Sequence, residues 1–126
     1  MKRLWIGAAL LLMLLAAGIF STLAMGRFHH SLSHRLEAAA SAALEEDWEQ
    51  TREILHQCRS RWLRFQNCIA AAASHEPIEE IDSLYSQLDI YLIRRDSVGF
   101  ALCCTALRHR TETLGEAQSI NWWNLL

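Results

Sequence analysis

The sequence has few of the residues that interrupt helices or build turn-rich β folds. It holds one proline and five glycines in 126 residues. No run of β-branched residues alternates with polar ones, which is the pattern of a half-buried strand. These absences exclude a sandwich or barrel and favour an all-α protein.

Lysine is absent after Lys2. Residues 28–126 contain nine arginines and fourteen aspartates or glutamates, a net charge near −5. Domains that bind nucleic acid usually present a basic face. The charge balance therefore argues against a nucleic-acid partner.

Charge is also missing from residues 4–26, which lie between Arg3 and Arg27. As a helix these 23 residues reach roughly 34 Å, enough to cross a hydrocarbon core of roughly 30 Å. We predict that residues 1–27 form a single-pass anchor that contacts lipid through residues 4–26. A cleaved signal peptide is the alternative, because Thr22-Leu23-Ala24 loosely resembles a cleavage site, but the apolar core is longer than signal peptides use. The basic start and short N-terminal tail favour the cytoplasmic membrane with the C-terminal domain outside the cytoplasm.

Residues 28–115 are predicted to form a bundle domain of about four amphipathic helices. Apolar residues recur at helical spacing along four seams. The connections are very short, so neighbouring helices should run antiparallel as αα-hairpins. The predicted fold is an N-terminal transmembrane helix followed by a small antiparallel helical bundle made of two hairpins. The seams are Phe28, Leu32, Leu36, Ala39, Ala40, Ala43 and Leu44; Leu55, Cys58, Trp62, Phe65, Ile69 and Ala72; Ile78, Ile81, Tyr85, Leu88 and Leu92; and Phe100, Cys104, Leu107, Thr111 and Leu114.

Capping residues mark the boundaries of these helices. Asp47 is placed to cap the second helix, with Gln50 completing a capping box. Pro77 suits the first turn of the third helix, and Gly115 is a predicted C-terminal stop for the fourth. Glu45-Glu46-Asp47-Trp48 and Arg94-Arg95-Asp96-Ser97 stand 49 residues apart in equivalent positions. We interpret this echo as shared turn chemistry rather than a true repeat.

Catalytic and metal-binding motifs are not visible. The sequence has no Gly-rich phosphate loop, nucleophile elbow or Ser/His/Asp constellation, so we expect no enzyme, no catalytic residue and no cofactor. His29, His30 and His34 form a cluster beside the apolar run. His30 and His34 stand at i, i+4 and could share a metal ion, but two ligands make a weak site. We expect no metal site and interpret these histidines as polar residues at headgroup level. Carboxylates and arginines on neighbouring helices are expected to pair with each other.

The four cysteines contain no C-x-x-C motif. Cys58 and Cys68 are roughly 15 Å apart on one helix and cannot bridge each other. We expect the cysteines to be small buried hydrophobes. A disulfide between helices, for instance Cys58 to Cys104, is the alternative.

The last segment, residues 116–126, is too apolar to extend freely into water. It could fold back onto the bundle, insert at the membrane interface where tryptophan is favoured, or dock into a partner. Its candidate partner-docking residues are Ile120, Trp122, Trp123, Leu125 and Leu126.

Several soft motifs occur together along nearly the whole chain. They are the basic start with Leu-Trp-Ile, the Glu-Asp-Trp-Glu turn, the Trp62 helix, the His-Glu-Pro-Ile-Glu-Glu-Ile opening and the Ser-Ile-Asn-Trp-Trp-Asn-Leu-Leu ending. In these the chain resembles an uncharacterised bacterial family of short membrane-anchored helical proteins, a domain of unknown function typical of Gram-positive spore-forming lineages. The resemblance implies an anchor and helices and supplies no activity. Cysteines are not part of that pattern, which weakens the disulfide alternative.

Two functions remain open from the sequence. The first is an interaction or scaffold protein tethered at the cytoplasmic membrane, which contacts a protein partner in or near that membrane. The second is a small extracytoplasmic module that senses a ligand, a metal or redox state through His30, His34 and the cysteines.

Overall fold

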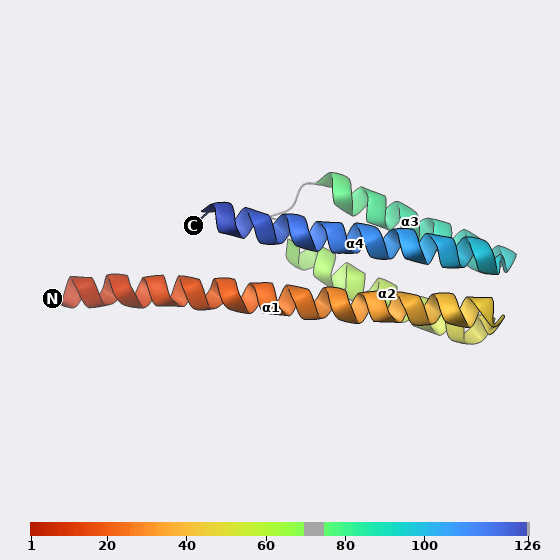
Figure 1. Ribbon diagram of the computed structural model, residues 1–126, viewed down its shortest axis with the longest axis horizontal. Helices are drawn as coiled ribbons and strands as arrows, with labels where there is room; N and C mark the ends of the chain where they lie inside the picture. The colour runs from red at the N-terminus through yellow and green to blue at the C-terminus, as the bar shows by residue number, and fades with distance from the viewer. Residues whose placement is uncertain (70–74, 126) are drawn as a thin grey trace.

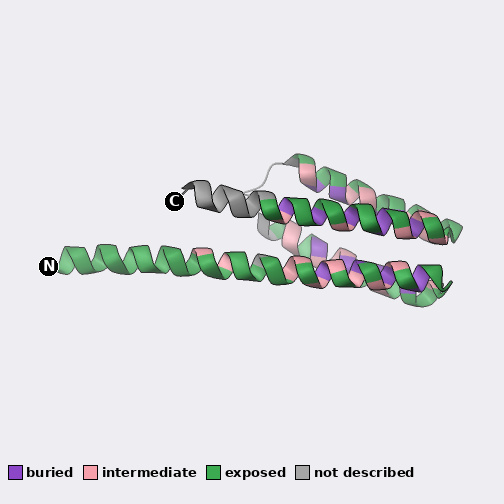
Figure 2. Ribbon diagram, viewed as in Figure 1, coloured by how far each residue is buried: buried purple, intermediate pink, exposed green. Residues whose placement is uncertain are grey.

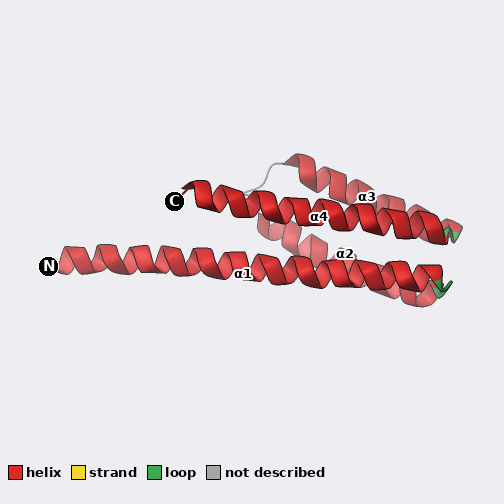
Figure 3. Ribbon diagram, in the orientation of Figure 1, coloured by secondary structure: helices red, strands yellow, loops and turns green. Residues whose placement is uncertain are grey.

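The computed structural model describes the backbone of residues 1–69 and 75–125, and the side chains of the same residues except 25, 68–69, 75 and 117–125. The described residues form four α-helices and no strand (Figures 1 and 3). The all-α prediction is confirmed. The helices are α1 (Lys2–Leu44), α2 (Trp48–Ile69), α3 (His75–Arg94) and α4 (Ser97–Leu125).

Each helix runs antiparallel to the one before it, so α1–α2 and α3–α4 are the two predicted hairpins (Figure 1). The bundle closes chiefly through α1 and α4, the first and last helices, which share the most extensive contact. The N-terminal half of α1 projects well beyond the other helices. We call the end from which it projects the proximal end, and the end that carries both hairpin turns the distal end.

The two distal turns have the same backbone geometry. Glu46 and Arg95 adopt left-handed φ values of 60° and 53°. In each turn the amide of the following aspartate donates to a carbonyl five residues back, at 3.0 Å. This is the hydrogen bond of a Schellman helix end, in which the left-handed residue usually is glycine. The 49-residue echo is therefore shared turn chemistry, as predicted.

The same aspartates begin the next helices. Asp47 Oδ1 accepts from the backbone N–H of Gln50 at 3.3 Å, and Asp96 Oδ1 accepts from that of Gly99 at 3.0 Å. The predicted cap at Asp47 is confirmed. Its reciprocal half is wrong, because the Asp47 amide donates to Ala42 instead of to the Gln50 side chain. One residue thus ends a helix and starts another, which explains why the connections are so short.

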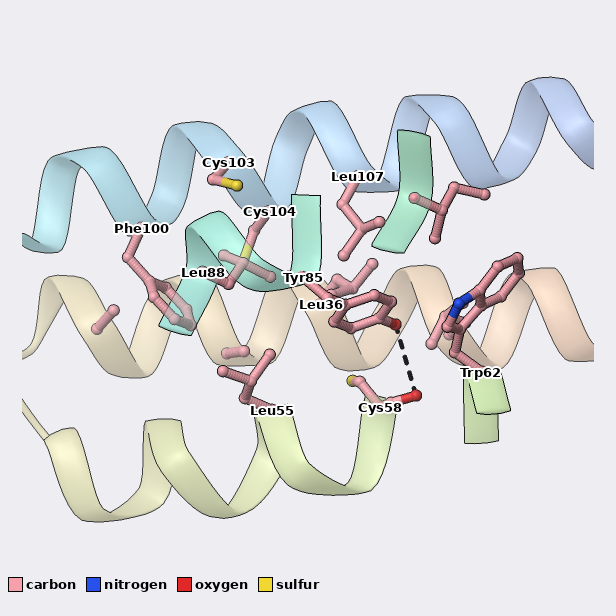
Figure 4. Close-up of a cluster of buried hydrophobic side chains, with 14 of the residues drawn as sticks. Leu36, Leu55, Cys58, Trp62, Tyr85, Leu88, Phe100, Cys103, Cys104 and Leu107 are labelled. Atoms are coloured by element: carbon pink, nitrogen blue, oxygen red, sulfur yellow. Dashed lines mark hydrogen bonds between the residues drawn. The ribbon is translucent and has the colours of Figure 1, made fainter. Parts of the chain in front are cut away.

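The core is formed by the predicted seams (Figure 4). Trp62, Tyr85 and Phe100 are its largest buried side chains. The hydroxyl of Tyr85 donates to the backbone carbonyl of Cys58 at 3.5 Å, which joins α3 to α2. Trp62 Nε1 donates to Asp82 at 2.9 Å, so its one polar atom is satisfied. The remaining buried apolar residues are Leu32, Leu36, Ala39, Ala42, Ala43, Leu55, Cys58, Ile78, Ile81, Leu88, Cys103, Cys104, Leu107 and Leu114.

Ion pairs join neighbouring helices, as predicted from the charge pattern. All are partly exposed, so each is expected to contribute no more than about 1 kcal/mol and to favour the correct helix order. They are Arg59–Asp89 at 2.6 Å, Arg108–Glu37 at 3.4 Å and Arg110–Glu80 at 3.3 Å.

Two predictions about helix faces and ends are wrong. Leu44, assigned to the first seam, is 57% exposed because it lies at the last position of α1, beside the distal turn. Gly115 does not stop the fourth helix, since α4 continues to Leu125 and Gly115 has no positive φ. Ala72 and the side chain of Ile69 lie outside the described residues.

Candidate membrane and partner interfaces

The projecting half of α1 is a large apolar surface. α1 is long and apolar enough to cross a membrane. None of the residues in its most apolar stretch is buried against the rest of the bundle. Figure 2 shows this half exposed almost throughout. Exposed apolar surface of this extent is unusual in a protein surrounded by water and marks an interaction site. The exposed large side chains are Leu4, Trp5, Ile6, Leu10, Leu11, Leu12, Met13, Leu14, Leu15, Ile19, Phe20 and Leu23.

Contacts between α1 and α4 fix their register. Ser33 on α1 donates to Glu112 on α4 at 3.4 Å, and four residues on, Glu37 pairs with Arg108. One turn back, His29 lies against Gly115. A step toward the N-terminus of α1 is therefore matched by an equal step toward the C-terminus of α4. Continued at this pitch, residues 119–125 of α4 reach the level of residues 19–26 along the axis of α1, where the apolar run lies.

An aromatic cluster closes the proximal end of the bundle. Phe28 of α1 stacks on Phe65 of α2, with ring centroids 4.4 Å apart. The His29 ring meets both of them edge-on, at 5.6 and 5.9 Å. On its other side, a Cβ added to Gly115 would lie 2.6 Å from two atoms of the imidazole. Only glycine lets α4 approach the ring this closely.

The two ring nitrogens of His29 are the polar atoms of this cluster. Both ring nitrogens are buried, and neither has a partner among the described residues. Burial lowers the pKa of His29 below its ordinary value of 6.5, and the charge of Glu112 partly opposes that shift. The imidazole is therefore neutral at pH 7.

A second apolar group lies at the distal end, around the α3–α4 turn. Ile93 and Leu102 are 81% and 67% exposed, and Ile90 and Val98 are exposed beside them in sequence. On each helix these residues lie on the face opposite the buried seam, so they do not belong to the hydrophobic core. Four large apolar side chains within two turns of one hairpin turn make a candidate contact surface for another protein.

Two open grooves lie on the described surface of the bundle. One groove of about 410 Å³ between α3 and α4 is lined by Glu79, Glu80 and Arg110 among others. The guanidinium of Arg110 already pairs with Glu80, so this groove holds no uncommitted cation opposite its acids. A second groove of about 200 Å³ lies between α1 and α4 near Glu37 and Arg108, which also pair with each other.

Three of the cysteines are described as free, buried thiols: Cys58, Cys103 and Cys104. Burial raises the pKa of Cys58 to about 11, and it also raises the pKa of Cys103 and of Cys104. The prediction of small buried hydrophobes is confirmed for these three, and the alternative Cys58–Cys104 disulfide is wrong. The side chain of Cys68 lies outside the described residues.

The other predicted site residues are not brought together. His30 and His34 are exposed, and in the described part of the chain no group of three potential metal ligands forms. The side chains of Ile120, Trp122, Trp123 and Leu125, and all of Leu126, lie outside the described residues. Their backbone through Leu125 belongs to α4 and is not a separate tail.

His29 is the residue that sequence reasoning missed. It was grouped with its neighbours as a polar residue at headgroup level. The signal that could have separated it is its spacing, since His29, Leu32 and Leu36 stand at i, i+3 and i+7 on one helix face.

The chain matches a known protein family. Residues 19–125 match a family model described as "Domain of unknown function (DUF4363)". Among curated proteins and among solved structures, none matches the chain. The match begins inside the apolar run of α1 and ends with α4, and it confirms the predicted resemblance to an uncharacterised family.

Proposed function

We propose that this chain, which belongs to the DUF4363 family, is a membrane-anchored, non-catalytic interaction protein. In this proposal residues 4–26 of α1 cross the cytoplasmic membrane, and the bundle, outside the cytoplasm, binds a protein partner in or near the same membrane. The family supplies no activity, so the proposal rests on the surfaces of the molecule.

The observation that carries the proposal is the unburied apolar half of α1. Twelve large apolar side chains in this half remain exposed, because the bundle does not cover them. Moving each from water into an apolar medium is worth roughly 1.5–3 kcal/mol, so insertion into lipid is favoured by tens of kcal/mol. A helix of this composition has no comparable gain available in water.

The partner contact is assigned to the distal apolar group. Ile90, Ile93, Val98 and Leu102 lie at the end of the bundle farthest from the projecting helix, where a protein beside the anchored chain can reach them.

Extraction from membranes tests the anchor. Membranes that contain the full-length chain are washed with alkaline carbonate, and the pellet and supernatant are probed for the protein. The proposal expects the chain in the pellet at its full length. Release into the supernatant, or loss of the first 24 to 27 residues by mass spectrometry, contradicts an uncleaved anchor.

Photo-crosslinking tests the partner surface. A photoreactive amino acid is placed at Ile93 or at Leu102, and the matched control places it at Leu63, a 50% exposed leucine on α2. We expect the same discrete adduct from both distal positions and none from Leu63. Adducts of equal yield at all three positions, or at none, contradict a specific distal interface.

A further inference from the structure

The two ends of the bundle differ in charge. The distal turns carry Glu45-Glu46-Asp47 and Arg94-Arg95-Asp96. At the proximal end, α2 has no charged residue from Phe65 to its last residue, Ile69, and α4 has none from Ala117 to its last residue, Leu125. A water-facing end usually carries charge, so an uncharged end beside an apolar helix suggests that both face the same apolar layer.

The register between α1 and α4 shows that the charged part of each helix ends at the same height along the bundle axis. The last charged residue of α1 before its apolar run is Arg27, and the last of α4 is Glu116. Gly115 lies against His29, so Glu116 stands within about one helical turn of Arg27 along the axis. Beyond this level α4 continues as helix for nine residues, all uncharged, beside the apolar run.

The depth follows from helix geometry. Starting at Leu4, a hydrocarbon core of roughly 30 Å is crossed in about 20 residues, which places its far boundary near Leu23. In the register above, the residues of α4 at that level are Trp122 and Trp123. Tryptophan is strongly enriched at the membrane–water boundary, because its ring is apolar and its N–H needs a polar partner.

Among residues 2–27 whose side chains are described, Gly18 and Ser21 are partly buried and the others are exposed. Ser21 stands seven residues before Phe28, on the same face of α1. At Gly18 an added Cβ would meet nothing within 4 Å, so no described neighbour covers that position.

We infer that the last turns of α4, residues 117–125, are a second membrane contact, seated beside α1 at the headgroup–acyl boundary with Trp122 and Trp123 at that boundary. The occupant of this surface is lipid. Exposed Arg27 and Arg64 lie just above the same level, since Phe65 stacks on Phe28, and they suit lipid phosphates. The inference rests on the proposed anchor and adds that the bundle is held upright by two helices.

Fluorescence quenching in vesicles tests it with the full-length chain. The protein is reconstituted in phosphatidylcholine–phosphatidylglycerol vesicles, and emission is compared between the wild type and the double variant Trp122→Phe, Trp123→Phe. The difference is the emission of the two C-terminal tryptophans. Single variants Trp5→Phe and Trp48→Phe isolate an anchor and a distal tryptophan in the same way, and circular dichroism checks that each variant keeps its helix content.

We expect phosphatidylcholine brominated near the top of its acyl chains to remove most of the Trp122 and Trp123 emission, while aqueous iodide removes little. Trp48 should respond to neither or to iodide alone. Quenching of the C-terminal pair by iodide, or by neither reagent, overturns the inference, because the pair then lies in water or inside protein. If Trp5 also escapes brominated lipid, the anchor itself has failed, which separates the two failures.

Discussion

Replacing Gly115 by alanine tests the closest approach of α1 and α4. A Cβ at this position would lie 2.6 Å from Cδ2 and Nε2 of His29 and 3.3 Å from its Cε1. Carbon atoms in favourable contact stand about 3.5–4.0 Å apart, so one side must move by about 1 Å. The imidazole cannot easily move, because Phe28 and Phe65 pack edge-on against it.

Two opposing effects set the magnitude. Overpacking of a fixed contact costs about 1–3 kcal/mol. Alanine is better than glycine in a helix interior by about 1 kcal/mol. Gly115→Ala should therefore lower the free energy of unfolding by up to about 2 kcal/mol, or the Tm by several degrees for a domain of this size. In a His29→Ala background the clash is absent, and the same substitution should stabilise by about 1 kcal/mol.

Thermal unfolding in mild detergent, followed by circular dichroism, measures all four chains of this double-mutant cycle. Gly26→Ala is the matched control, since Gly26 is a helical glycine of α1 with nothing within 4 Å of an added Cβ. The reversal of sign between the two backgrounds is the diagnostic result. If Gly115→Ala stabilised the wild type as much as the His29→Ala chain, the close packing of these helices would be refuted.

Three further predictions follow from the turns, the histidine and the thiols. Glu46→Gly and Arg95→Gly should each stabilise the bundle by about 1 kcal/mol in thermal melts, because glycine adopts left-handed φ without strain; no gain at either position would contradict the turn geometry. Because burial lowers the pKa of His29, the unfolded chain takes up its proton more readily, so the free energy of unfolding should fall as pH drops below about 6.5, and less so in His29→Phe. At pH 7.5 Cys58 and Cys104 should resist iodoacetamide until the chain is unfolded, as judged by peptide mass spectrometry, because burial keeps them as thiols; rapid labelling of the native chain would show that they are not buried.

Helix faces and helix starts could be predicted because local chemistry decides them. The seam from Phe100 to Leu114 follows from apolar spacing alone, and all its members are buried. Asp47 and Asp96 cap helices in this structure as their side chains suggest, because the cap is made within three residues of sequence. Such features need no knowledge of the partner helix.

Features that depend on the partner helix were missed. Gly115 was predicted to be a C-terminal stop, because glycine is common just after the last turn of a helix. In the structure it instead admits the His29 ring from α1. Periodicity says which face of a helix is buried and not which helix covers it, so the extensive pairing of α1 with α4 was not predicted. The burial of His29 follows from that pairing.

The pairing of the first helix with the last has a consequence for biosynthesis. Ser33 and Glu112 meet across 79 residues of sequence, so α1 emerges from the ribosome long before the helix that covers it. Until α4 is made, the core face of α1 has only α2 against it, and contacts this distant in sequence form slowly. A nascent chain stopped short of α4 would leave Leu32 and Leu36 partly uncovered, a natural target for chaperones or proteases at the membrane. Completion of the C-terminus is thus the step that commits the chain to its fold.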